Sequence, residues 1–131
     1  MEQPETRPSY PASPGLRAYA QVAQATMGPR QASLLLHERL CRELMSAKHA
    51  YQQGRLDRMC RHIEKCLRVL IVLQSGVKPA PGEPGPLILS GFYLDLFQRV
   101  RMILRNPKVE DAFDGVISNL RVFCEKMRAA A

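Results

Sequence analysis

Residues 55–74 read RLDRMCRHIEKCLRVLIVLQ, and their apolar residues recur with the period of an α-helix. One set follows alternating spacings of four and three and predicts a core seam: Leu56, Cys60, Ile63, Leu67 and Leu70. A second set lies beside it: Met59, Cys66, Val69 and Leu73. Together the sets cover roughly 200° of the helix surface, where a surface helix usually shows about 100°. We therefore expect a helix that lies in the middle of a bundle or lends its second face to a partner.

Prolines that open helices and glycines that stop them divide the rest of the chain. The other expected long helices run from Gly28-Pro29 to about Gln53, from Pro86 to about Arg105, and from Asn106-Pro107 to about Met127. Residues 77–86 form a proline- and glycine-rich linker, residues 1–15 a flexible tail, and residues 16–128 one domain. This pattern predicts an all-α fold, an antiparallel four-helix bundle preceded by a short N-terminal helix or extended segment.

The composition agrees with a helical domain that works in a reducing compartment. The 131 residues are 46% hydrophobic and only 6% aromatic. Four cysteines, at positions 41, 60, 66 and 124, have no C-x-x-C spacing, so we expect free thiols that act as small apolar side chains. The first 15 residues lack the pattern of a secretory signal, and no run of 18 apolar residues could span a membrane. We therefore expect a cytoplasmic protein.

The sequence offers little for catalysis, and we expect no enzyme, no cofactor and no metal. Its three histidines, His37, His49 and His62, lie on different stretches, and no nucleophile motif is present. His62 and Cys66 share a helical face, but two ligands without a second pair do not make a metal site.

Nucleic-acid binding is a rival hypothesis, because the net charge is +7. A basic stripe follows the polar side of the 55–74 helix and consists of Arg58, Arg61, Lys65 and Arg68. Such a stripe would track phosphates, and Arg99, Arg101 and Arg105 would extend it from another helix. No aromatic residue interleaves with the stripe, which favours a solvated basic surface.

The surplus apolar surface indicates a partner. On the 29–53 helix, Leu36, Leu40, Leu44, Ala47 and Tyr51 form a seam that Leu34, Cys41 and Met45 widen. Self-association as a homodimer would bury part of this surface. The rest of this apolar surface would form a groove for an amphipathic helix of another protein. Adaptable methionine and cysteine side chains suit such a groove.

Several stretches, in order, resemble the bacterial flagellar secretion chaperone family FliS. In residues 18–40, AYAQVAQATMGPRQASLLLHERL, Tyr19 precedes Pro29 by ten residues, and a leucine-rich helix follows. In residues 47–73 the family pattern matches at Ala47, Gly54, Lys65, Val69, Leu70 and Leu73. Residues 89–97, LSGFYLDLF, resemble the family's Leu-x-x-Leu-Tyr helix start. Residues 114–127, DGVISNLRVFCEKM, resemble its closing helix. The resemblance covers residues 16–128.

The resemblance implies a chaperone that binds the C-terminal segment of newly made flagellin, prevents its premature polymerisation and presents it to the cytoplasmic domain of the flagellar export gate. By the resemblance, Leu16 and Tyr19 match a pair implicated in gate docking, and the sequence leaves open whether the same segment covers the groove at rest. We hypothesise that the flagellin contacts are Met45, Met59, Cys66, Val69 and Leu73. A homodimeric structural bundle and a basic nucleic-acid-binding bundle are the alternatives.

Overall fold

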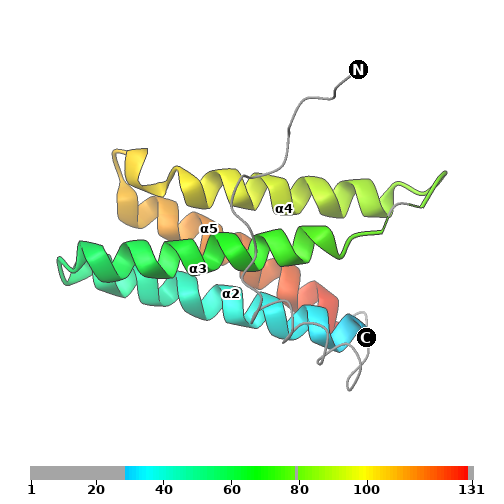
Figure 1. The fold of residues 1–131 in the computed structure, drawn as a ribbon, viewed down its shortest axis with the longest axis horizontal. Coiled ribbons are helices and arrows are strands. Elements are labelled where there is room, and N and C mark those ends of the chain that lie inside the picture. Colours follow the sequence, from blue (N-terminus) through cyan, green and yellow to red (C-terminus); the bar gives the residue numbers. More distant parts are fainter. Residues whose placement is uncertain (1–28, 79, 130–131) are drawn as a thin grey trace.

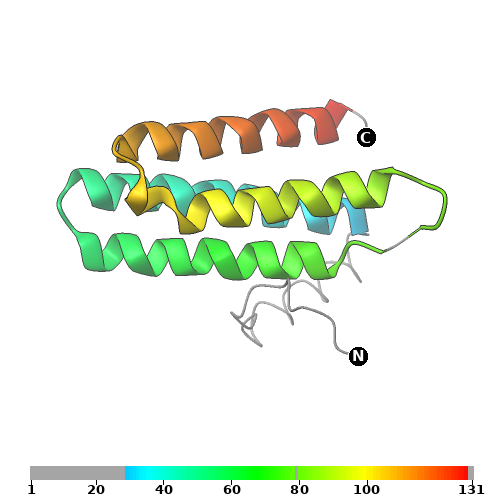
Figure 2. The same cartoon turned by 90° about the horizontal axis from the view of Figure 1, so that it is seen from above.

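The structure is a computed structural model that describes residues 29–78 and 80–129. These residues form α2 (Pro29–Gln52), α3 (Leu56–Ser75), α4 (Gly85–Arg101), the 3-10 turn η1 (Ile103–Arg105) and α5 (Val109–Ala129). Consecutive helices run in opposite directions (Figures 1 and 2). Both α2 and α4 pack against α3 and α5, while the backbones of the diagonal pairs stay apart. The all-α prediction is confirmed, and the expected tail and N-terminal segment lie outside the described residues.

The turn between α2 and α3 forms where the sequence predicts it. Gly54 adopts a positive φ of 75°, which glycine tolerates because it has no Cβ. Its N–H donates to the Tyr51 carbonyl at 3.0 Å, and the Arg55 N–H donates to the Ala50 carbonyl at 2.8 Å. These bonds satisfy the last carbonyls of α2 and fold α3 back against it.

The connection between α4 and α5 differs from its prediction. Helix α4 ends at Arg101, and α5 begins at Val109, two residues after Pro107. Asn106 is extended, with φ −78° and ψ 133°, because a residue before proline avoids the helical region. Its side chain accepts a hydrogen bond from the Lys108 N–H at 2.9 Å. Asn106 is therefore a turn residue three positions before the first residue of α5, and the predicted helix start at Asn106-Pro107 is wrong.

The core receives one apolar stripe from each helix. The predicted seam of α2 is confirmed at Leu36, Leu40, Leu44 and Ala47, which are buried. Helix α5 contributes Phe113, Val116, Ile117, Leu120 and Cys124, which are also buried. Helix α4 contributes Tyr93, Leu96, Phe97 and Val100. Full burial of such side chains contributes about 1.5–3 kcal/mol each before conformational entropy is subtracted. Packing of the four stripes is therefore the main source of stability.

One polar side chain, His37, is fully buried among the described residues. Its Nδ1–H donates to the Ser33 carbonyl at 2.6 Å, so its Nε2 accepts the hydrogen bond from the Tyr93 hydroxyl at 2.9 Å. Its ring centroid lies 5.0 Å from that of Phe123. Burial lowers the pKa of His37 and raises that of Tyr93 to about 12. The neutral pair therefore joins α2 to α4 across the core.

Candidate functional site

The structure assigns the two apolar faces of α3 differently from the sequence prediction. The residues expected to face a partner, Met59, Cys66, Val69 and Leu73, are 1%, 0%, 1% and 6% exposed. The expected core seam is confirmed at Leu67 and Leu70, which are buried. It is wrong at Leu56, which is 55% exposed, and at Cys60, which is also exposed. The set expected to face a partner therefore lies on the buried face of α3. The prediction that this set forms an open surface is therefore wrong.

The remaining predicted contact, Met45, does lie on the surface. It belongs to α2 and is 45% exposed, whereas its neighbour Leu44 is 0% exposed. Met45 faces α5, where the two helices leave a groove between them. The other two predicted site residues, Leu16 and Tyr19, lie outside the described residues.

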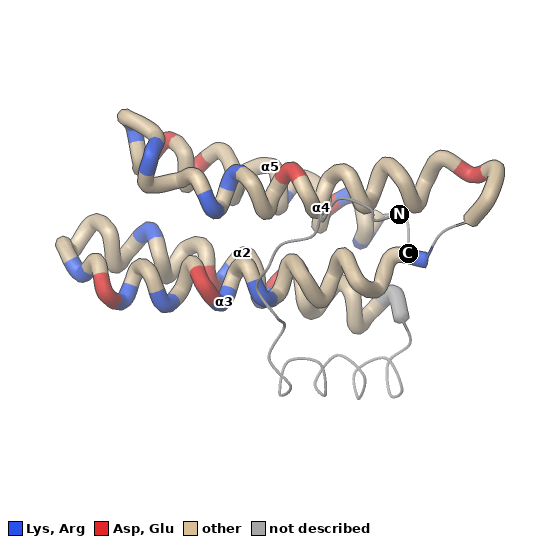
Figure 3. Tube along the Cα trace, turned by 45° about the horizontal axis from the view of Figure 1, so that its top comes forward, with Lys and Arg blue, Asp and Glu red and all other residues tan. Residues whose placement is uncertain are grey.

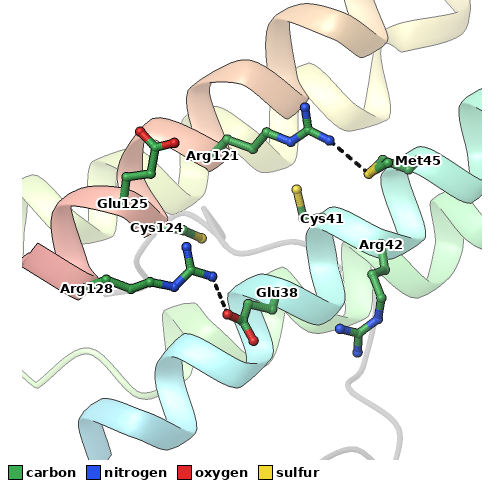
Figure 4. A pocket seen from close by; sticks show the side chains of 8 residues that line it. All are labelled: Glu38, Cys41, Arg42, Met45, Arg121, Cys124, Glu125 and Arg128. Carbon is green, nitrogen blue, oxygen red and sulfur yellow. Dashed lines mark hydrogen bonds and ion pairs between the residues drawn. The ribbon is translucent and has the colours of Figure 1, made fainter.

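The α2–α5 groove has a volume of about 420 Å³. Each helix contributes four residues at i, i+3, i+4 and i+7, which is the spacing of one helical face. The lining residues are Glu38, Cys41, Arg42 and Met45 from α2, and Arg121, Cys124, Glu125 and Arg128 from α5 (Figure 4). The groove therefore follows the seam of two antiparallel helices for about two turns.

Polar contacts cross the groove at two levels. The Arg121 guanidinium reaches from α5 to the Met45 sulfur at 3.3 Å (Figure 4). About two helical turns further along, at the other end of the groove, Arg128 pairs with Glu38. A thioether is a weak acceptor, so the Arg121–Met45 contact gives way easily to a better partner of either group. The groove can therefore open at little cost at the end where Met45 and Arg121 meet.

Beyond the groove, ordinary polar pairs close the seam. Lys48 Nζ lies 2.6 Å from Asp114 Oδ1, and Gln52 Nε2 donates to Glu110 Oε1 at 3.3 Å. These contacts lie toward the end of the bundle where α2 and α3 meet. They give the groove a definite end.

The groove contains two thiols, Cys41 and Cys124, whose side chains both face into it (Figure 4). Burial raises the pKa of the Cys124 thiol, and nearby Cys41 adds to the shift. Burial also raises the pKa of Cys66, in the core beside α2. Cys66 and Cys124 therefore stay protonated near neutral pH and act as apolar, polarisable surface. The arrangement suits an adaptable binding surface rather than nucleophilic chemistry.

The described residues contain no group of three potential ligands that could hold a metal ion. His62 Nδ1 lies 2.7 Å from Glu43 Oε1 on α2, so this pair braces the α2–α3 seam. In the basic stripe, Arg61 pairs with Asp57 at 3.5 Å and Arg68 with Glu64 at 2.8 Å. Half of the stripe is thus neutralised along its own helix.

The sequence prediction found Met45 but not the residues that face it. The sequence pattern places Cys41 and Cys124 on apolar faces and gives no role to Arg121. The signal was present as two i, i+3, i+4, i+7 sets that mix charge with sulfur, at positions 38–45 and 121–128. Only the pairing of α2 with α5 brings these sets together.

Comparison with known proteins supplies the family. The family model described as "Flagellar protein FliS" matches residues 12–127. No curated protein and no solved structure matches the chain. None of the helices in residues 29–78 and 80–129 is long and apolar enough to cross a bilayer. The family model covers most of the chain and all of the core stripes described above, and the chain therefore belongs to the FliS family of flagellar proteins.

Proposed function

We propose that the protein is a cytosolic export chaperone that binds the C-terminal segment of flagellin, prevents its premature polymerisation and presents it to the export gate. Membership of the FliS family supports this role. The observation that supports the proposed location of the binding site is the open α2–α5 groove, in which Met45 is 45% exposed. The groove replaces the buried face of α3 as the proposed first contact.

The chemistry of the groove suits an amphipathic helix. Its floor offers sulfur and apolar carbon from Cys41, Met45 and Cys124, and its rim offers guanidinium groups. A guest helix would place residues at i, i+3, i+4 and i+7 along the seam. Because Met45 is flexible and polarisable, it can adapt to apolar side chains of different shape. A guest that folds only on binding loses part of its contact energy to ordering, which keeps release possible.

A guest does not reach Met59, Cys66, Val69 or Leu73 while the bundle is closed, because these side chains are at most 6% exposed. Their contact with flagellin would require α3 to separate from its neighbours. Such opening exposes apolar surface at about 25 cal/mol per Å². We therefore place contact with these four residues in a second step, after the groove is occupied.

Docking to the export gate is assigned by family analogy to Leu16 and Tyr19. Tyr19→Ala should then impair association with the cytoplasmic domain of the gate while flagellin binding persists. A pull-down with the gate domain, in the presence of bound flagellin segment, measures this directly. Loss of both associations together would instead place Tyr19 in the flagellin site.

Calorimetric titration with the last 50 or so residues of flagellin, about the length of a segment that folds on binding, tests the function. We expect a one-to-one complex with a large negative heat-capacity change. Met45→Ser should weaken it about tenfold, because the side chain loses apolar contact. Leu104→Ser is the matched control, since Leu104 is 48% exposed and lies on the α4–α5 connection, away from the groove. Absence of heat with the parent chain would contradict the chaperone function.

A further inference from the structure

The two ends of the bundle differ in charge. The α2–α3 turn and the α4–α5 connection lie at the same end (Figures 1 and 2), where Gln52 bonds to Glu110. We call this the basic end and define it as residues 53–58 and 101–108. The linker end, residues 76–91, lies opposite. Lys and Arg residues concentrate toward the basic end (Figure 3).

The basic end combines exposed cations with exposed apolar side chains. Its exposed cations are Arg55, Arg58, Arg101, Arg105 and Lys108, and none of them forms an ion pair with a described residue. Its exposed apolar side chains are Leu56, Met102 and Leu104, at 55%, 41% and 48%. The patch is therefore amphipathic.

The acids near this end reduce its charge only in part. Asp57 pairs with Arg61, and Glu110 accepts the hydrogen bond from Gln52. Asp111 stands on the α5 side, near Met102, in a hollow that both line. The five cations thus outnumber the nearby carboxylates that lack a partner of their own.

The linker end has apolar exposure without this charge. Leu87 and Ile88 are 78% and 69% exposed, more than any apolar side chain of the basic end. Lys78 and Glu83 are the charged residues in this region and have opposite signs. If apolar exposure alone determined docking, the linker end would dock more strongly. The comparison therefore separates the effect of charge from that of hydrophobicity.

We propose that the basic end docks on the surface of a bilayer that contains anionic phospholipids. Arginine and lysine are attracted to phosphate headgroups within about one Debye length. Exposed leucine and methionine side chains insert at the boundary between headgroups and acyl chains, where apolar surface leaves water. A duplex nucleic acid fits less well, because its backbone gives leucine and methionine nothing to bury against. No aromatic residue lies among residues 53–58 and 101–108 to stack on bases.

Docking by an end leaves the sides of the bundle free. The α2–α5 groove runs along the seam between two helices, and Lys48 and Gln52 separate it from the basic end. A protein held at its basic end therefore keeps the groove accessible. Membrane docking and occupation of the groove are independent, so each can be tested without the other.

Flotation of the full chain with vesicles provides the test. Vesicles of phosphatidylcholine with about one-third phosphatidylglycerol should carry the protein upward, and vesicles of phosphatidylcholine alone should not. Raising the salt concentration from about 0.05 M to about 0.5 M should release it, because the Debye length shortens. Equal flotation on both vesicle types would overturn the proposal.

Variants locate the contact. Arg105→Glu combined with Lys108→Glu should weaken binding more than tenfold, because two attractions become repulsions. Leu104→Ser should weaken it a few-fold and leave the salt dependence unchanged. Leu87→Ser, at the linker end, is the matched control and should bind like the parent chain. Helical circular dichroism and the urea unfolding midpoint should stay like those of the parent chain in all three variants, which shows that they are folded.

Two further results would overturn the proposal. One is full vesicle binding by the double charge variant. The other is displacement of the vesicles by a DNA duplex that binds the Leu104→Ser variant as tightly as the parent chain. The surface would then recognise phosphate without apolar insertion. Displacement that also weakens with Leu104→Ser would support the amphipathic patch.

Discussion

Helix α2 packs on α3 along one side and on α5 along the other, and the two seams differ. Toward the core, Leu40 and Leu44 have no exposed surface. Toward α5, Met45 is 45% exposed at the edge of an open groove. Leu44 and Met45 are neighbours in the sequence, yet the first holds the fold together and the second is available to a partner. The helix pattern shows which residues are able to be buried, and the neighbouring helix determines which ones are.

The largest effect should come from a charge in the closed seam. Val69→Asp places a carboxylate at a position that is 1% exposed, without a partner for the charge. We expect destabilisation by more than about 4 kcal/mol and loss of helical circular dichroism. Val122→Asp is the control, since Val122 is 48% exposed on α5. A helical Val69→Asp variant that has lost flagellin binding would restore Val69 to an open binding face.

The adjacent pair on α2 gives a direct comparison of fold and function. Leu44→Ala should lower the free energy of unfolding by about 2–5 kcal/mol, because it leaves a cavity in the core. Met45→Ala should change it by less than about 0.5 kcal/mol and yet weaken flagellin binding. Urea unfolding followed by circular dichroism, with titration of the flagellin segment, measures both. Equal destabilisation by the two changes would place Met45 in the core.

The buried His37–Tyr93 pair predicts a pH range of greatest stability. Burial lowers the pKa of His37 from 6.5, so its contribution is complete above about pH 6.5 and is lost as the pH falls toward the lower native value. Burial raises the pKa of Tyr93 from 10 to about 12, so its contribution is lost as the pH rises through that interval. Urea midpoints between about pH 5 and about pH 7.5 test the acid side.

A matched variant identifies the group responsible. His37→Phe removes the titrating ring and should flatten the acid side of the stability profile, whereas His49→Phe, on the exposed surface of α2, should not. A profile that stays unchanged in His37→Phe would contradict the assignment of the acid sensitivity to His37.

The smallest effect concerns the ion pair that closes the α2–α5 seam. Lys48→Ala removes the contact with Asp114, whose side chain is 57% exposed. Because water screens such a pair, the free energy of unfolding should fall by no more than about 1 kcal/mol. The difference should shrink further in high salt, as thermal unfolding at two salt concentrations would show. A larger loss would mean that the pair also controls the register of the two helices.

Much of the fold follows from local sequence rules. Gly54 marks the end of α2 because its backbone conformation suits glycine, and the period of Val116, Leu120 and Cys124 marks the buried face of α5. Asn106-Pro107 misled the prediction, because the proline shifts the helix start to Val109. That shift depends on how the 3-10 turn joins α4 to α5, which a local motif does not specify.

The binding surface was harder to predict than the fold. Helix α3 carries two apolar stripes of similar width, and nothing within residues 55–74 states which residues of each stripe the bundle buries. The groove forms only where Met45 meets Arg121, residues separated by 76 positions. Sequence periodicity contains no information about such pairings. The assembled bundle buries Val69 and leaves Met45 45% exposed.

The native cysteines provide the most direct test of where flagellin binds. Cys41 lies in the groove and is partly exposed, Cys60 is exposed on α3, and Cys66 and Cys124 are buried. Alkylation of the folded protein, with the modified peptides identified by mass spectrometry, should label Cys41 and Cys60. Addition of the flagellin C-terminal segment should protect Cys41 and leave Cys60 unchanged. A bound segment that protects Cys60 while Cys41 is still labelled at its original rate would contradict the account.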